Sequence, residues 1–441
     1  MADLLSSRRV VTPDGIRPAT IVVDGDKIVE LRSDVNSAVE TDAVILPGLV
    51  DCHVHVNEPG RTEWEGFATA TRAAAAGGIT TIVDMPLNCI PVTTTLAALK
   101  EKREAIAGTC FVDVGFWGGV IPGNAPELEP MVRAGVRGFK CFLIHSGIDD
   151  FPHVTESDLR VAMPILARLG VPLLAHAELD CVSPPSATAD PCAYQTFLDS
   201  RPPQMENEAI ALLVRLSRET GCRVHIVHLS SAEALPILRQ ARAEGVPISA
   251  ETCPHYLYFA AEEIPDGHTE YKCAPPIRGR DNQAALWKAL LSDELAFVVS
   301  DHSPCTPHLK LRETGDFMGS WGGISSLQLG LSTLWTRARD RGVGIEKLAK
   351  WMSAGPAAFA GLAGKGAIAV GADADLVIWD PDATFCVDGK QLFHRHKVTP
   401  YHGQELHGVV RETYLAGRPI FARGAHEGAP MGRQLVNMRT T

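Results

Sequence analysis

The sequence predicts an α/β fold: a (β/α)8 TIM barrel that carries a small β-sandwich domain built from both chain ends. Three observations predict this fold. Short apolar runs of strand length alternate with longer helical stretches through the middle of the chain, eight such runs occur, and β-branched runs recur near both ends. The length of 441 residues accommodates a barrel of about 250 residues or more together with an attached domain.

The small β-domain is expected to combine residues 1–46 with residues 365–441. Near the first end, two β-branched runs flank the turn signal Pro13–Gly15, which predicts a β-hairpin. The second end holds further strand-like runs, and we therefore expect the two ends to share one domain. The runs are Arg9–Thr12, Thr20–Val23, Gly371–Asp380 and Gly408–Gly417.

The barrel is expected over residues 47–364. Its eight candidate strands are Leu49–His53, Thr80–Asp84, Phe111–Phe116, Gly138–Phe142, Pro172–His176, Arg223–His228, Pro247–Thr252 and Ala296–Asp301. Helical patterns lie between most of them, at Glu65–Ala76, Leu96–Ala107, Ser157–Leu169, Glu206–Glu219, Ala232–Ala243 and Asn282–Leu291. A doubly wound open sheet is the competing fold. Neither GxGxxG nor GxxxxGK[ST] follows the first strand, which removes the usual phosphate-binding reason for such a sheet.

The composition limits which binding partners and which cellular compartment are expected. The formal charge of -11, from 41 Lys+Arg against 52 Asp+Glu, argues against nucleic acid, because a phosphate-binding chain normally shows a basic stripe. The 11 cysteines are scattered with no CxxC, which is typical of reduced thiols and favours a cytoplasmic location. No signal peptide and no spanning helix are expected, and hence no membrane partner.

The strongest local signal is the run Asp51-Cys52-His53-Val54-His55. Residues i and i+2 of a strand point to the same face, so His53 and His55 can bind one metal together. Other ligand-type residues close later candidate strands, where a barrel assembles its active site. They are Lys140 on the fourth strand, His176 on the fifth, His228 on the sixth and Asp301 on the eighth.

The number of ligands favours two metal ions. Four imidazoles and one carboxylate exceed the three protein ligands that a catalytic zinc site usually takes. The ammonium of Lys140 would be repelled by two dications, so this lysine is expected to be neutral or chemically altered. A carboxylated amine would form an anionic bridge; the alternative is a surface lysine, which the apolar run Gly138–Leu143 disfavours. Zinc is the first expectation, and iron, cobalt and manganese also suit these ligands.

The ligand pattern resembles the binuclear branch of the amidohydrolase superfamily, and Gly366–Asp380 is similar to the closing β-segment of that superfamily. Within its cyclic amidohydrolase branch, several long segments are closely similar to the allantoinases. These segments are His53–Gly66, Asp84–Asn88, Gly138–Leu143, Ser300–Cys305 and Trp321–Gln328.

The resemblance implies a complete assignment of the ligands. His53, His55 and Asp301 would bind the first metal, His176 and His228 the second, and N6-carboxylated Lys140 would bridge them. It also implies the activity, which is hydrolytic opening of the hydantoin ring of allantoin to allantoate by a metal-bridging hydroxide, a step of purine catabolism. Similar proteins are usually homotetramers.

The residue at position 57 distinguishes dihydroorotases from related cyclic amidases that act on neutral rings. Dihydroorotases carry Arg at this position, where it pairs with the substrate carboxylate, whereas the neutral amide of Asn57 suits a neutral ring such as allantoin. Dihydropyrimidinases and hydantoinases also take neutral rings and remain alternatives. A third class, the non-catalytic assembly or signalling proteins of this fold, typically loses metal ligands, and none of the six is missing here.

Asp301 is also the expected catalytic acid/base, because amide hydrolysis needs an acid for the leaving nitrogen; the alternative is a purely ligating role. Residues in loops that follow strand ends are candidates for substrate contacts, each with loop packing as the alternative. These candidates are Asn57, Asn88, Cys273, Ser303 and Trp321.

Overall fold

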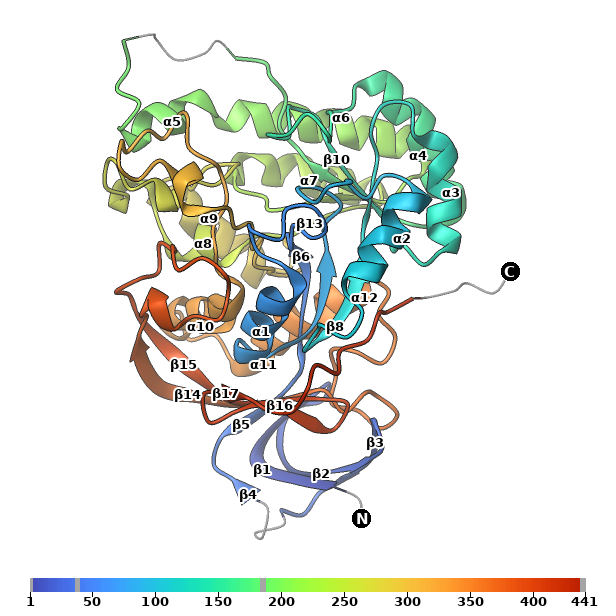
Figure 1. Ribbon diagram of the computed structural model, residues 1–441, viewed down its shortest axis with the longest axis vertical. Helices are drawn as coiled ribbons and strands as arrows, with labels where there is room; N and C mark the ends of the chain where they lie inside the picture. Colours follow the sequence, from blue (N-terminus) through green and yellow to red (C-terminus); the bar gives the residue numbers. More distant parts are fainter. Residues whose placement is uncertain (1–2, 36–39, 183–187, 437–441) are drawn as a thin grey trace.

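The computed structural model describes residues 3–35, 40–182 and 188–436, and the predicted α/β class is confirmed (Figure 1). Nine strands from both ends of the chain form one sheet in the order β17-β16-β15-β14-β5-β1-β2-β3, with β4 paired to β1. The strands are β1 Asp3–Thr12, β2 Gly15–Asp24, β3 Lys27–Arg32, β4 Glu40–Thr41, β5 Val44–Pro47, β14 Leu376–Cys386, β15 Glu405–Leu415, β16 Arg418–Ala422 and β17 Ala425–His426.

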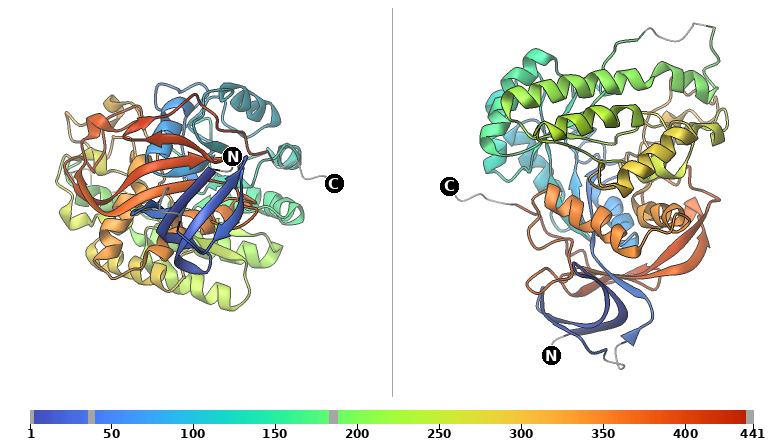
Figure 2. Two further views of the ribbon diagram at one scale, coloured as in Figure 1. Left: turned by 90° about the horizontal axis from the view of Figure 1, so that it is seen from below. Right: turned by 180° about the vertical axis from the view of Figure 1, so that it is seen from behind.

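The two chain ends meet where β5 pairs antiparallel with β14, for example Leu46 with Val377. Figure 2 shows the resulting arrangement from below, with the N-terminal strands beside the C-terminal ones. The predicted hairpin is confirmed, because β1 and β2 pair antiparallel up to Thr12 and Gly15 at the turn. The described strands from the two ends of the chain therefore share one sheet.

Parallel strands fill the middle of the chain in two further sheets. One sheet has the order β6-β7-β8, and the other has the order β13-β12-β11-β10-β9. Trp117 connects them, since β8 ends one residue before it and β9 begins one residue after it. The strands are β6 Leu49–Val54, β7 Ile79–Asp84, β8 Asp113–Phe116, β9 Gly118–Gly119, β10 Phe139–Phe142, β11 Leu173–His176, β12 Val224–Ile226 and β13 Ile248–Ala250.

The eighth expected run, Ala296–Asp301, forms parallel bridges rather than a regular strand. Val298 pairs with Thr252, and His302 pairs with Val54. Only part of this backbone bonds to the neighbouring strands: the N–H of Val299 donates to Thr252 O (3.2 Å), but the N–H of Val298 donates to Trp351 O (3.0 Å) and the N–H of Ser300 to the carboxylate of Asp51 (3.0 Å). The segment therefore lies between β13 and β6 without a continuous ladder.

Each of the six predicted helical patterns corresponds to a helix, with ends that differ by a few residues. Further helices, among them α3 and α10, lie in segments for which no helix was predicted. The helices are α1 Phe67–Ala76, α2 Leu96–Ala105, α3 Ala125–Arg133, α4 Glu156–Leu169, α5 Tyr194–Ser200, α6 Pro203–Thr220, α7 Leu235–Ala243, α8 Pro254–Tyr258, α9 Arg280–Leu291, α10 Gly330–Arg339, α11 Ile345–Ala349 and α12 Gly355–Phe359. In the described part of the chain, no helix has the length and apolar character to cross a membrane.

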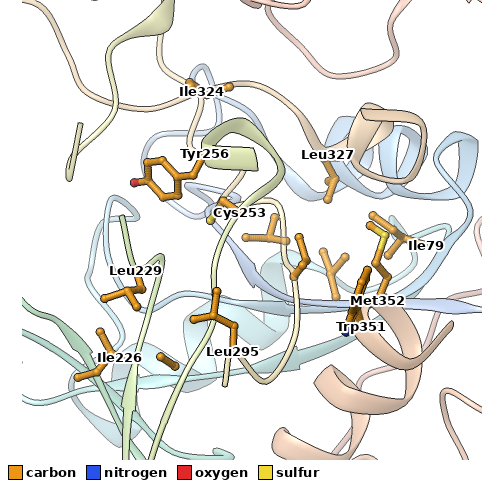
Figure 3. Packing of buried hydrophobic residues seen from close by; sticks show 14 of the residues in the cluster. Ile79, Ile226, Leu229, Cys253, Tyr256, Leu295, Ile324, Leu327, Trp351 and Met352 are labelled. Carbon is orange, nitrogen blue, oxygen red and sulfur yellow. The ribbon is translucent and has the colours of Figure 1, made fainter. Parts of the chain in front are cut away.

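A large apolar core packs the helices against the parallel strands. Figure 3 shows part of it, in which Ile226 of β12 and Ile79 of β7 belong to one cluster with Trp351 and Met352. A buried ion pair adds to this packing, since Lys365 Nζ lies 2.7 Å from Asp113 at the start of β8. Removing one partner of such a pair typically costs about 3–5 kcal/mol of the free energy of unfolding.

Candidate metal centre

The six predicted metal ligands come together at or near the C-terminal ends of the parallel strands; Lys140, which was expected to close the fourth strand, lies two residues before the end of β10 Phe139–Phe142. Five of them line one cavity of about 740 Å³. They are His55 after β6, Lys140 within β10, His176 at the end of β11, His228 after β12, and Asp301 after the Val298 bridge. His53 on β6 is fully buried and is not among the residues described as lining the cavity.

His53, His55 and Asp301 form the first ligand group. The Nε2 atoms of the two imidazoles lie 3.2 Å and 3.5 Å from Asp301 Oδ1, and ligand atoms of all three residues lie within 4.8 Å of one another. Two imidazoles and one carboxylate at this spacing suit a divalent ion such as zinc.

The electrostatics of the first group also suit a cation. Burial alone would lower the pKa of His53, but the charges of Asp301 and Glu251 outweigh burial and raise that pKa to about 9. Burial would raise the pKa of Asp301; the charge of His53 and the hydrogen bonds from both histidines hold it well below its usual range. In the absence of a metal ion, protonated His53 therefore balances the negative charges of Asp301 and Glu251. A bound dication would balance these charges instead.

His176 and His228 form the second group, with 3.0 Å between His176 Nδ1 and His228 Nε2. Burial, followed by the charge of Lys140, holds the pKa of both imidazoles well below the usual value. Both rings are therefore neutral at pH 7. Neutral rings whose nitrogen atoms converge in this way can share one metal ion.

Lys140 lies among these ligands as a buried amine. Its side chain is fully buried, and its Nζ has no hydrogen-bond partner among the described residues. Burial lowers the pKa of Lys140 to about 8. Leaving a buried amine without a partner is costly. The observation fits a lysine that carries a further group in the working protein.

The backbone is strained at the ends of these strands. His228 (φ 40°) and Asp301 (φ 44°) both adopt left-handed conformations that non-glycine residues rarely take. Asn57 (φ 67°) and Asn88 (φ 68°) do the same nearby. Such conformations persist where the surrounding structure determines them, and they cluster at functional sites.

Two carboxylates beside the ligands were missed in the sequence. Glu251 Oε1 lies 2.5 Å from His53 Nδ1, and Glu178 Oε2 lies 2.6 Å from His176 Nε2. The sequence does contain a signal for each of these two carboxylates. Glu251 falls within the seventh candidate strand run, and Glu178 follows His176 at the same i, i+2 spacing that singled out His53 and His55.

The predicted substrate contacts divide into two sets. Asn88, Ser303 and Trp321 line the cavity, whereas Asn57 and Cys273 are absent from the described lining. The Asn57 amide donates to Pro304 O (3.2 Å), and the Cys273 thiol donates to Pro275 O (3.4 Å). The structure also brings to the cavity Arg201 and Lys272, which sequence reasoning did not single out.

Comparison with known proteins identifies the family. The amidohydrolase family model matches residues 44–420. The chain is 50% identical over 443 residues to an allantoinase from Streptomyces avermitilis, with 98% of each chain covered. It is 43% identical to an allantoinase from Arabidopsis thaliana, with 97% of this chain and 90% of that one covered.

Solved structures of related enzymes have the same fold. An L-hydantoinase (dihydropyrimidinase) from Arthrobacter aurescens matches with a TM-score of 0.91 at 30% identity, covering 99% of this chain and 100% of that one. A dihydropyrimidinase from Brevibacillus agri matches with a TM-score of 0.88 at 28% identity, covering 99% and 98%. The chain therefore belongs to the amidohydrolase family, and within it to the allantoinases.

Proposed function

We propose that the protein hydrolyses the hydantoin ring of allantoin to allantoate with the help of two divalent metal ions per subunit. The observation that carries the proposal is the complete set of six ligands gathered around one cavity. The similarity to allantoinases over nearly the whole chain supports the choice of substrate.

The proposal assigns each ligand of the centre to a metal ion. His53, His55 and Asp301 hold the first ion, and His176 with His228 holds the second. Lys140, carboxylated on its Nζ, would supply an anionic ligand to both ions. The unpartnered and weakly basic amine of Lys140 supports carboxylation, because the reaction with CO2 requires a neutral amine. Zinc is the favoured metal, and iron, cobalt and manganese remain alternatives.

Asp301 is the acid/base of the proposed reaction. When bound, the two ions would lower the pKa of a shared water towards neutrality and polarise the scissile carbonyl. The lowered pKa of Asp301 keeps its carboxylate ionised at neutral pH, so it can accept the proton of the attacking water. It then gives that proton to the ring nitrogen as the carbon–nitrogen bond breaks, while the oxygen stays on the carbonyl carbon as a carboxylate.

The cavity wall offers partners for an amide edge of the ring. Asn88 Oδ1 and Trp321 Nε1 are buried and have no hydrogen-bond partner within the described chain, which leaves one acceptor and one donor. A ring amide presents the complementary N–H and C=O. Ser303 adds a hydroxyl. Asn57 and Cys273 would act on the cavity only through neighbouring backbone, at Pro304 and Pro275 respectively.

We further propose that the two parallel sheets form one closed (β/α)8 barrel over residues 47–364, with residues 1–46 and 365–441 as a β-sandwich domain. The parallel bridges Thr252–Val298 and Val54–His302 support closure, because they connect β13 to β6 through the eighth run. A homotetrameric assembly and a cytoplasmic location, inferred from the family resemblance and the cysteine pattern, remain predictions.

Hydantoinase or dihydropyrimidinase activity is the second candidate, favoured by the match to the Arthrobacter aurescens structure. Dihydroorotase activity is disfavoured by Asn57. Initial rates of the metal-loaded protein on allantoin, dihydrouracil, 5-substituted hydantoins and dihydroorotate distinguish these activities. We expect kcat/KM to be highest for allantoin. A protein that leaves allantoin intact but opens dihydrouracil or hydantoins would show the substrate assignment to be wrong.

A further inference from the structure

One histidine ring of each ligand group contacts a buried carboxylate that does not line the cavity. Glu251, which directly follows β13, contacts His53, and Glu178, which follows β11, contacts His176. Both glutamates are fully buried, and neither belongs to the described cavity lining. Among the ligand rings, Glu251 contacts only that of His53 and Glu178 only that of His176; Glu251 Oε1 also accepts a hydrogen bond from the backbone N–H of His228 (3.3 Å).

The two carboxylates contact opposite ring nitrogens of their histidines, Nδ1 of His53 and Nε2 of His176. At these distances each carboxylate oxygen is placed to accept a hydrogen bond from the ring nitrogen that faces it. His53 therefore donates from Nδ1, and its other nitrogen, Nε2, faces the ligand Asp301 (3.2 Å), where a bound metal ion would replace the proton on Nε2. His176 donates from Nε2, which leaves the lone pair on Nδ1 directed at His228 (3.0 Å).

Further hydrogen bonds hold each carboxylate in place. Glu251 Oε2 lies 3.0 Å from His225 Nε2, and His225 Nδ1 lies 2.7 Å from Ser249 Oγ. Glu178 accepts a hydrogen bond of 2.5 Å from Arg201, whose side chain lines the cavity. One carboxylate is thus fixed from inside the protein, and the other from the cavity wall.

We propose that Glu251 and Glu178 are positioning residues, each of which sets the affinity of a different metal ion. Glu251 orients His53 for the first ion, and Glu178 orients His176 for the second. The inference rests on the proposed metal centre but not on the identity of the substrate. Partners that orient a ligating histidine typically change metal affinity by about 10–100-fold when they are removed.

Variants that retain a single site test the two roles separately. His55→Ala removes a ligand of the first site only, and His228→Ala removes a ligand of the second site only. Glu251→Gln and Glu178→Gln are combined with each, so that every glutamine variant is the matched control for the other. The zinc dissociation constant is measured by competition with a chromophoric chelator, and the visible absorption of bound Co²⁺ reports the ligand geometry.

In the His55→Ala protein we expect Glu178→Gln to weaken zinc binding about 10–100-fold and Glu251→Gln to change it less than about threefold. In the His228→Ala protein we expect the reverse. The Co²⁺ spectrum should change only in the combination that weakens binding. Equal weakening by both variants in one background, or no weakening by either, would overturn the proposal.

A glutamine variant that fails to fold would be detected by urea unfolding. Variants that keep the carboxylate provide a second test in that case. Glu251→Asp and Glu178→Asp retain an acceptor-only carboxylate and are measured in both backgrounds. Each aspartate variant should weaken zinc binding at its own site less than the matching glutamine variant does. It should still weaken binding at its own site more than at the other site. Loss of this site preference would overturn the proposal even where a glutamine variant does not fold. A failed substrate assignment would leave these affinities unchanged and would appear only in the rates.

Discussion

The Nζ atom of Lys140 lies 5.0 Å from the centre of the Phe142 ring, which stacks at 4.5 Å on the ring of His176. The lysine is therefore enclosed by an aromatic surface on one side and by metal ligands on the other. This environment accounts for the lowered pKa of Lys140, because burial disfavours the charged ammonium.

The carboxylation of Lys140 should depend on pH. With a pKa of about 8, roughly a tenth of the amine is neutral at pH 7 and roughly nine tenths at pH 9. Protein freed of metal and CO2, and then given zinc at a fixed concentration of dissolved CO2, should regain activity about tenfold faster at pH 9 than at pH 7. Activity measured at one assay pH after each incubation provides the rate. A rate that does not rise with pH would argue against carboxylation of a neutral amine.

Lys140→Ala should abolish activity, because the bridge between the two ions is lost. A short carboxylic acid such as propionate should restore part of the activity by occupying the space of the missing group. The same acid added to the unchanged protein serves as the control. Absence of rescue, together with an unmodified lysine mass in the intact protein, would count against the bridge.

Asp301→Asn separates the acid/base role from the ligand role. Loss of general acid/base catalysis typically lowers kcat by about 10²–10⁴-fold. We expect a loss of this size even when excess zinc fills both sites, as verified by metal analysis of the assayed sample. Recovery of kcat at high zinc would mean that Asp301 is only a ligand.

Asn88 and Asn57 form a matched pair for the substrate cavity. Both adopt positive φ and both have an unpartnered Oδ1 in the described chain, but only Asn88 lines the cavity. Glycine accepts this backbone conformation, so Asn88→Gly and Asn57→Gly remove the side chains without added strain. Loss of one neutral hydrogen bond should raise the KM for allantoin about 2–10-fold in Asn88→Gly. The KM of Asn57→Gly should remain near that of the unchanged protein, and equal effects would contradict the cavity geometry.

Much of the site could be predicted because it is encoded at the ends of apolar runs. His53, His176 and Asp301 each close a candidate strand run in the sequence, and parallel strands bring such positions to one edge. The hairpin at Pro13–Gly15 was predictable for a similar reason, since turn residues between β-branched runs leave few alternatives.

Other features depend on tertiary contacts that no local pattern reveals. The run Ala296–Asp301 looks like its neighbours in sequence, but its backbone is bound by Asp51 and Trp351 instead of a continuous ladder. Cys273 directs its thiol to Pro275 O, although both of its chain neighbours line the cavity. Side-chain direction in loops follows packing and not periodicity.

Metal titration of the metal-free protein, with allantoin turnover measured at each addition, tests the two-metal allantoinase most directly. We predict that the metal-free protein is inactive and that formation of allantoate rises with added zinc and levels off at two equivalents per subunit. Turnover without metal, a plateau at one equivalent, or a fully loaded protein that leaves allantoin unchanged would contradict the account.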